Sequence, residues 1–510
     1  MMSCEKPQIP QFYAGRSVFI TGATGFVGQV LVERLLYTCP DIERLFLLLR
    51  EKKNCGPMQR LRLLKDSPVF DNVRQKNPSQ LEKLTVVSGD ITKPQLGLQQ
   101  ESIDLLQNVS VVFHSAATIK FEEPFATAVE QNIKPVTKIM ELCDNLPNME
   151  AFVYVSTAYS NAELTVVEER VYSPPVPLKN HLALVDNATP EQLSNITQEC
   201  IAPKPNTYTY SKAMAEVVVQ EHTGRTYSAA IFRPTIVVSA MRHPHAGWVQ
   251  GLNGPSGVVA SAGKGLLHVL HARGSARADM LPVDIAVDTL IAVAWETATD
   301  RIPEVRVYNC SSSENPTTWS QFEDGIRRNM REHPFDNAFW WPCGSSIENW
   351  FVYKILEFLL HTMPLYIAEY VMLLLGTKSR INMITLNSRL QGMNSVLAFF
   401  SKREWKFDTR NVQMLRRRLT PQDAAIYNLD PNTIDWNEHY KNFVKGVRKY
   451  LLKERDEDIE KAKHHMRKLY FLHLTVLVVF IFLILRTVMQ LTNTQKVIWS
   501  IGGLIDALLY

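Results

Sequence analysis

The chain has 510 residues, 46% of them hydrophobic, and a net charge of +4. This length allows two or three domains with sizeable cores, and the composition excludes a wholly disordered chain. The mild charge, without an arginine-rich arm or zinc-finger spacing, argues against nucleic acid as a partner. The seven cysteines are far apart and form no CxxC pair, so they indicate neither a disulfide framework nor a metal site and favour a reducing, cytosol-facing compartment.

From residue 16 to about 300, short apolar runs alternate with longer segments suited to helices. Each run is continuous rather than alternating, as expected of strands buried on both faces. The segment 123–145 carries apolar residues at helical spacing. We therefore predict an α/β fold with a Rossmann-type doubly wound parallel sheet. The six runs begin at Ser17, Ile42, Lys83, Val109, Ala151 and Ala229.

A glycine-rich turn, TGATGFVG, follows the first of these runs. It places Gly22, Gly25 and Gly28 three residues apart, directly before a predicted helix. Glycines there let backbone amides approach a pyrophosphate at the positive end of the helix. A tight turn without a ligand is the alternative, but the strand–turn–helix context favours a dinucleotide site. Thr24 and Phe26, within the same turn, are further candidates for cofactor binding.

The residues after the second run indicate which dinucleotide is bound. An NAD site usually carries an acid there for the ribose hydroxyls. This chain has Arg50 instead, with Lys52 and Lys53 nearby. A guanidinium suits a 2′-phosphate through paired, charge-assisted contacts, so NADPH is the expected cofactor. The alternative is that Arg50 is a solvated charge at a strand end.

Two later strand ends add candidates for the same site. Asp90 follows the third run, where its carboxylate is expected to hydrogen-bond the adenine. Ala116 and Ala117 follow the fourth run, where the chain is expected to pass close to the cofactor and bulk is not tolerated. Simple packing of small residues is the alternative for these two alanines.

The stretch PNTYTYSKAMAE contains two tyrosines ahead of one lysine. In a helix, residues four apart share a face and residues two apart do not, so Tyr208 lies beside Lys212 whereas Tyr210 points away. An adjacent ammonium is expected to lower the phenol pKa from its ordinary value near 10, which suits a proton donor to a carbonyl. Lys212 is also expected to reach the nicotinamide ribose.

Two hydroxyls, Ser156 and Thr157, end the fifth run at the carboxyl edge of the sheet, where ligands of open sheets bind. Either hydroxyl is suited to hold the substrate oxygen, and the sequence does not distinguish them. The alternative role for both is a helix cap or a turn.

From about 345 to 455 the composition changes. Residues 349–376 are apolar and aromatic but carry an ionisable residue every few positions. We expect two helices that meet at Pro364 and form a buried or membrane-surface pair rather than a span. Residues 407–454 look like a small helical module.

The segment Leu469–Leu485 has 17 residues, one histidine and no formal charge, and is predicted to be a transmembrane helix. The basic cluster 461–468 outweighs Arg486 after it, which places the N-terminal part in the cytosol. A buried core helix is the alternative. An intracellular membrane is expected, and the endoplasmic reticulum and the peroxisome both fit. Residues 497–510 are expected to lie in the interface or to re-enter.

The motifs TGATGFVG, GDI, HSAA, VSTAY, YTYSK and RPT together resemble the extended short-chain dehydrogenase/reductase superfamily. Residues 232–267 and 279–291 look like the substrate half of alcohol-forming fatty acyl-CoA reductases, and 427–454 is similar to the C-terminal domain of that family. The resemblance covers most of residues 14–454.

This resemblance implies three parts of the chain. Residues 14–340 would form an NADP-binding extended short-chain reductase domain, residues 345–455 a helical domain of the fatty acyl-CoA reductase type, and residues 469–485 a membrane anchor. The implied activity is NADPH-dependent reduction of long-chain fatty acyl-CoA to a primary alcohol with release of CoA, in two hydride transfers through an aldehyde.

The resemblance also assigns roles. Tyr208 and Lys212 become the catalytic pair, with Ser156 or Thr157 as their partner, and the three glycines and Arg50 become cofactor ligands. Two alternatives stay open. One is a reductase of sterol or sugar-nucleotide substrates, and the other is a catalytically silent, membrane-anchored lipid-binding scaffold.

Overall fold

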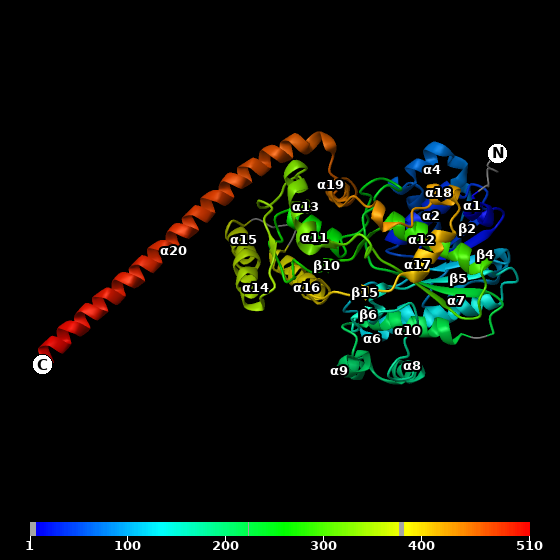
Figure 1. Cartoon of the computed structure of the whole chain (residues 1–510), viewed down its shortest axis with the longest axis horizontal. Helices are drawn as coiled ribbons and strands as arrows, with labels where there is room; N and C mark the ends of the chain where they lie inside the picture. Colours follow the sequence, from blue (N-terminus) through cyan, green and yellow to red (C-terminus); the bar gives the residue numbers. More distant parts are fainter. Residues whose placement is uncertain (1–6, 223, 377–381, 510) are drawn as a thin grey trace.

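The computed structural model describes residues 7–222, 224–376 and 382–509. Figure 1 shows a body built around a sheet, a helical lobe beside it and one long terminal helix, α20 (Ile459–Leu509). Within the described residues the main sheet has seven strands, and all neighbouring strands run parallel. Their order across the sheet is β12 (Arg306–Cys310), β7 (Ser228–Pro234), β5 (Ala151–Val155), β4 (Val109–His114), β1 (Ser17–Thr21), β2 (Arg44–Leu49) and β3 (Leu84–Ser88).

The doubly wound sheet is confirmed, and six of its strands are the six predicted runs. The seventh strand, β12, was not predicted. It lies at the edge of the sheet, pairs only with β7 there, and its sequence RVYNC is not a continuous apolar run. The sixth run also ends earlier than expected, because the chain leaves the main sheet after Pro234 and continues as β8 (Ile236–Val238), which pairs with β11 (Met280–Pro282).

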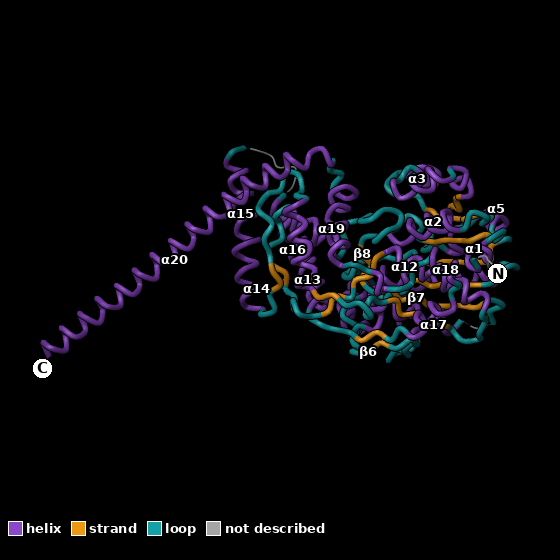
Figure 2. The backbone as a smooth tube through the Cα atoms, turned by 45° about the horizontal axis from the view of Figure 1, so that its top comes forward, coloured by secondary structure: helices purple, strands orange, loops and turns teal. Residues whose placement is uncertain are grey.

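Helices cover both faces of the sheet (Figure 2). On one face α2 (Phe26–Thr38) and α12 (Val283–Thr299) pack together, and on the other α7 (Lys134–Asp144) and α10 (Thr207–Glu221) form a second core. Successive strand residues point to opposite faces, so Val18 enters the first core and Phe19 the second. This arrangement leaves the carboxyl edge of the strands free for ligands.

The helical lobe contains α14 (Trp350–Glu357), α15 (Met363–Leu374) and α16 (Met383–Ser401). The junction between α14 and α15 is a π-helical turn, Phe358–Thr362, rather than a break at Pro364 as predicted. The proline is the second residue of α15. Because proline has no N–H and its ring crowds the preceding turn, the wider π turn before it lets one nearly continuous helix form.

Residues 406–446 are largely helical, as predicted, and they pack along the body. The helix α17 (Arg410–Arg418) contacts α12, and α19 (Trp436–Gly446) packs on α13 (Trp319–Glu332). The buried carboxylate of Asp423 accepts hydrogen bonds from the backbone amides of Gln8 and Ile9, at 2.9 and 3.0 Å. The helix α18 (Pro421–Ile426) therefore holds the N-terminal helix α1 (Gln8–Tyr13) against the body.

Two helices are long and apolar enough to cross a membrane, Trp350–Leu374 and Asp456–Gln490. This composition indicates membrane association. The second belongs to α20, which continues as one helix to Leu509 and does not bend at the glycines of 497–510, where a re-entrant or interfacial segment was one expectation.

Candidate active site

A cavity of about 560 Å³ lies at the carboxyl ends of the central strands. The glycine turn, the ends of β2 to β5 and the first turns of α10 contribute to its wall. All of the predicted site residues line it. They are Gly22, Thr24, Gly25, Phe26, Gly28, Arg50, Asp90, Ala116, Ala117, Ser156, Thr157, Tyr208 and Lys212.

The glycine turn has little room for side chains. Gly22 has a φ of +77°, and a Cβ there would lie 2.7 Å from the amide nitrogen of Ala116. A Cβ at Gly28 would lie 2.2 Å from the carbonyl oxygen of Gly22. Gly25 is the N-cap of α2 and has no side chain that could accept a hydrogen bond from the first amides of the helix. These amides therefore stay available for a ligand in the cavity. This cradle fits a pyrophosphate.

Two guanidinium groups meet beside the turn. Arg50 Nη1 lies 3.3 Å from Asp90 Oδ2 and is half exposed. Arg60, from α3 (Pro57–Lys65), donates to the Arg50 carbonyl and to Thr24 Oγ1, each at 2.7 Å. Burial and the charge of Arg50 lower the pKa of Arg60. Of these two like charges only Arg50 is paired with a carboxylate, so this corner of the cavity suits an anionic phosphate group.

Asp90 lies in the cavity wall and already has partners within the protein. Its carboxylate accepts from the amide and hydroxyl of Thr92, at 3.0 and 2.9 Å, and pairs with Arg50. Burial alone raises the pKa of Asp90, but the hydrogen bonds of Thr92 and the charge of Arg50 outweigh it and lower that pKa. The side chain thus holds Arg50 and the loop after β3 in place.

Tyr208 lies at the start of α10, partly exposed to the cavity, with Thr157 in the same cavity wall. Burial raises the pKa of Tyr208 to about 12, and the Thr157 hydroxyl offsets only part of this rise. The prediction that Lys212 lowers the phenol pKa is therefore wrong for this structure. The phenol is held protonated and ready to donate.

Lys212 lies one turn further along α10 and lines the same cavity. Its Nζ donates to the carbonyl oxygen of Val155 at 2.8 Å, where β5 ends, and sits 4.8 Å from the ring centre of Tyr154. Burial lowers the pKa of Lys212 to about 7, against a smaller opposing effect of Glu216. Protonation of this amine therefore changes near neutral pH.

The two strand-end hydroxyls have different partners. Ser156 donates to the carboxylate of Glu216, which also forms a buried ion pair with Arg233 at 2.6 Å. The Thr157 hydroxyl instead accepts from the Tyr159 amide at 3.3 Å, as the cap of the short helix Ala158–Asn161, and it lines the cavity with Tyr208. Sequence reasoning missed Glu216 and Arg60. The available signals were the position of Glu216 four residues after Lys212 on one helix face and a second arginine ten residues after Arg50.

Tyr210 lies away from the cavity, as predicted. Its hydroxyl bonds with Nδ1 of His181 at 2.6 Å, and its ring packs near Phe125 in the second core.

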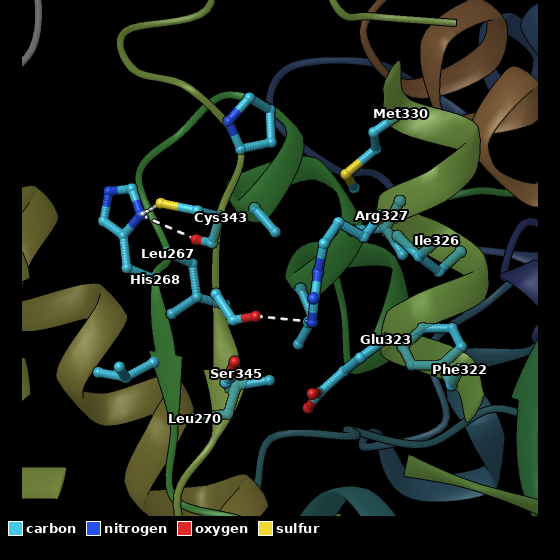
Figure 3. Close-up of a pocket in the computed structure, with 16 residues that line it drawn as sticks. Leu267, His268, Leu270, Phe322, Glu323, Ile326, Arg327, Met330, Cys343 and Ser345 are labelled. Carbon is cyan, nitrogen blue, oxygen red and sulfur yellow. Dashed lines mark hydrogen bonds between the residues drawn. The ribbon is translucent and has the colours of Figure 1, made fainter. Parts of the chain in front are cut away.

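Two smaller cavities continue from this site along α11 (Pro255–Gly263). One, of about 20 Å³, shares Pro255 with the large cavity. It shares Val258 and Phe322 with a third cavity of about 60 Å³, shown in Figure 3. In that view Arg327 donates to the Gly344 carbonyl at 2.8 Å, while apolar side chains form most of the wall. The three cavities form an interrupted, largely apolar line that begins at the sheet edge.

The fold and the main cavity define the class of protein, a Rossmann-type oxidoreductase that uses a nicotinamide cofactor. Solved structures agree with the fold. The reductase domain of a non-ribosomal peptide synthetase from Mycobacterium tuberculosis matches with a TM-score of 0.57 and 19% identity, covering 86% of this chain and 92% of that one. The terminal R domain of the myxalamid pathway matches with a TM-score of 0.56 and 18% identity, over 85% and 90% of the two chains.

Sequence comparisons narrow the class. Residues 20–290 and 360–454 match two families that are both described as male sterility protein. Fatty acyl-CoA reductase 1 of Mus musculus is 33% identical over 96% of this chain and 95% of its own length. Fatty acyl-CoA reductase 2 of Bos taurus is 36% identical over 91% and 90% of the two chains. The chain belongs to the fatty acyl-CoA reductase family, which confirms the resemblance seen in its motifs.

Proposed function

We propose that this protein reduces long-chain fatty acyl-CoA to a primary fatty alcohol with release of CoA, using NADPH in two hydride transfers through an aldehyde. The observation that carries the proposal is that Tyr208, Thr157 and Lys212 line the same cavity as the glycine turn. Membership of the fatty acyl-CoA reductase family supports the acyl-CoA substrate.

The residues around the main cavity fit NADPH. The amides of the turn and of α2 would hold the pyrophosphate, Arg50 and Arg60 the 2′-phosphate, and Lys212 the nicotinamide ribose. Ala116, held against Gly22, keeps the cofactor path free of bulk. When bound there, NADPH supplies the hydride.

Thr157 and Tyr208 would bind the oxygen of the substrate carbonyl. Hydroxyl donors aimed at an oxygen that gains negative charge stabilise the transition state. In reduction of the thioester this charge is relieved when CoA leaves as a thiolate. In reduction of the aldehyde it is relieved by the proton of Tyr208, which the raised pKa keeps on the phenol at neutral pH. Ser156 and Glu216 position the end of β5 and α10 rather than touch the substrate.

The fatty chain of the substrate would follow the interrupted line of cavities along α11. This direction is favoured because Val258 and Phe322 line both smaller cavities and because the walls are largely apolar. Both are small in this structure, so a long chain would open them by displacing flexible side chains such as Met330.

The three parts expected from the sequence belong to the same proposal. Residues 14–340 would carry the cofactor and the chemistry, and residues 345–455 would form the helical domain. Residues 469–485 would span an intracellular membrane, of the endoplasmic reticulum or the peroxisome, with the basic cluster 461–468 and the catalytic body on the cytosolic side.

Incubation of the full chain with palmitoyl-CoA and NADPH, followed by thiol titration and product chromatography, tests the proposal. Fatty alcohol with two NADPH consumed per CoA released is the expected result. Aldehyde with one NADPH would mean that only the first reduction occurs. NADPH binding without oxidation by any acyl-CoA would favour the scaffold alternative, and turnover of sterol or sugar-nucleotide substrates alone would favour a different reductase.

A further inference from the structure

The outer surface of α14 and α15 is apolar and open. In α15, all of whose residues the structure describes, no residue is buried. Phe351 and Leu374, at the two ends of the pair, are each 71% exposed, and Ile355, Phe358 and Tyr370 between them are more than half exposed. Large side chains of this kind gathered on one surface mark a contact site rather than the ordinary scatter of apolar residues on a soluble protein.

Glu357, His361 and Glu369, three of the ionisable residues of this segment, are held by contacts within the protein. Glu357 is buried and accepts from the Tyr353 hydroxyl and, at 2.7 Å, from Lys354 Nζ. His361 is buried and accepts from a backbone amide of β9 (Val269–Leu270) and from the amide before it, at 3.3 and 2.7 Å. Glu369 accepts from the first amide of α16 at 2.9 Å. The charges that argue against a membrane-spanning segment are thus satisfied on the inner side, and the outer side stays apolar.

The part of α20 that begins the proposed membrane span contacts the loop before α14. Trp340 donates through Nε1 to Nδ1 of His473 at 3.1 Å, and the ring of Trp341 lies 4.8 Å from that of Tyr470. His473 and Tyr470 belong to the proposed span 469–485, so its first turns are bonded to the loop that leads into α14. In Figures 1 and 2 α14 and α15 lie near the base of α20, at the end of the molecule away from the sheet. Aromatic residues at such a junction are typical of the bilayer interface.

We propose that α14 and α15 form a second membrane contact and lie in the interfacial layer of the lipid bilayer beside the transmembrane helix. The inference rests on the proposed anchor. A lipid surface is favoured over a second copy of the chain because the anchor already fixes these helices beside the bilayer. A long side chain such as Lys354, 48% exposed, can extend its ammonium to the headgroups while its stem lies on apolar surface.

Photolabelling of the full chain in phosphatidylcholine vesicles tests this contact. The vesicles contain a phosphatidylcholine with a diazirine on its acyl chain, and peptide mass spectrometry after irradiation maps the adducts. We expect adducts both in 469–490 and in 350–375. Adducts in 469–490 alone overturn the inference and leave the anchor standing, whereas adducts in neither segment contradict the anchor itself. In a parallel sample treated with a bifunctional protein cross-linker, cross-links between the α14–α15 surfaces of two chains, together with an absence of lipid adducts there, would assign the surface to a dimer.

A pair of matched variants separates surface contact from general exposure. The double variant Phe351→Glu, Leu374→Glu is expected to lose the adducts in 350–375 and to keep those in 469–490. The control Leu63→Glu, Leu105→Glu changes two residues that are 61% and 53% exposed, on α3 and α5 (Gln100–Leu105), at the far end of the body, and is expected to change neither set. NADPH fluorescence checks that each variant is folded, and the unmodified chain carries the test if a variant is not.

Discussion

The two faces of α10 carry the same residue types and use them differently. On the cavity face, Tyr208 lies in the same wall as Thr157 and Lys212. On the core face, Tyr210 is bonded with His181 and packs among apolar side chains. A tyrosine two positions along a helix thus changes from a candidate proton donor to a packing residue. Position relative to the sheet edge, rather than residue type, decides the chemistry available.

The two hydroxyl residues that follow β5 also differ in whether they join the cavity or the buried core. Thr157 lines the cavity with Tyr208, whereas Ser156 joins the buried ion pair of Glu216 and Arg233, whose side chains are 1% and 0% exposed. A buried pair of this kind holds the elements that carry it in one arrangement, because removing either partner leaves an uncompensated charge. The buried pair of Glu216 and Arg233 therefore fixes the position of α10 and of the end of β5, which carry the residues of the cavity wall.

Removal of the Tyr208 hydroxyl is expected to have the largest effect and tests whether the two faces of α10 differ in function. In Tyr208→Phe we expect kcat to fall by about 10²–10⁴, the usual range for loss of a general acid, while NADPH affinity stays near that of the parent. Tyr210→Phe loses one buried hydrogen bond, costs about 1 kcal/mol of stability and keeps its activity. Steady-state kinetics and NADPH fluorescence titration measure both. Equal loss of activity in the two variants would show that the faces are not distinct.

Separate removal of the two hydroxyls sharpens the comparison. Thr157→Val is expected to lower kcat by about 10²–10³, as for loss of one donor to a developing oxyanion, and to cost about 1 kcal/mol of stability because Thr157 caps the short helix Ala158–Asn161. Ser156→Ala removes one hydrogen-bond donor from the buried Glu216 carboxylate. This variant should therefore have a lower melting temperature and nearly unchanged kcat. A reversed pattern in kinetics and thermal melting would assign the substrate oxygen to Ser156.

Arg60 lies beside Arg50 and Thr24, outside the motifs that predicted the cofactor site. Its replacement tests whether it contributes to binding of the 2′-phosphate. Arg60→Ala should raise KM for NADPH by about 10–100-fold, the equivalent of one charge-assisted hydrogen bond, and leave KM for NADH nearly unchanged. Arg62→Ala, on the same helix and without a contact to Thr24, is the matched control. Equal effects on both nucleotides would place the 2′-phosphate elsewhere.

The chain path along α11 predicts a smaller effect. Val258→Phe adds bulk where the two smaller cavities meet and should lower kcat/KM for palmitoyl-CoA about tenfold relative to a short acyl-CoA. Competition between the two substrates, resolved by product chromatography, gives this ratio. An unchanged ratio would exclude the path past Val258.

Lys212 adds a dependence of stability on pH. Its pKa falls from 10.5 to about 7 on folding, so between these values the unfolded chain binds a proton that the folded chain lacks, and this contribution to the free energy of unfolding increases with pH. Below about pH 7 the burial cost of the charge is present in full. Lys212→Met without nucleotide should therefore gain most in melting temperature, by a few degrees, below pH 7 and progressively less above it. A difference that does not vary with pH would contradict the shifted pKa.

Much of the site could be predicted because local pattern dictates it. The glycine spacing requires a strand before it and a helix after it, and Tyr208 and Lys212 share a face through helical geometry alone. Arg60 and Glu216 escaped prediction because their roles depend on contacts with Thr24 and Ser156, 36 and 60 residues away in the chain. The edge strand β12 escaped because it is short and mixed in character.

The apolar helices show a different limit of sequence reasoning. Both α12 and α15 are rich in apolar residues, yet nearly all of α12 is buried and none of α15 is. The ionisable residues of 349–376 suggested a surface pair, but only the structure shows Glu357 and His361 turned inward. Whether an apolar helix is buried or exposed depends on the elements packed against it and cannot be predicted from its own composition.

The most direct test of the account is a structure of the full chain with NADP⁺ and a non-reducible acyl-CoA analogue. We predict the pyrophosphate on the turn of Gly22, Gly25 and Gly28, and the nicotinamide beside Lys212, with the carbonyl oxygen of the analogue within hydrogen-bonding distance of Tyr208 and Thr157. A nicotinamide remote from Tyr208, or a carbonyl oxygen held by other residues, would contradict it.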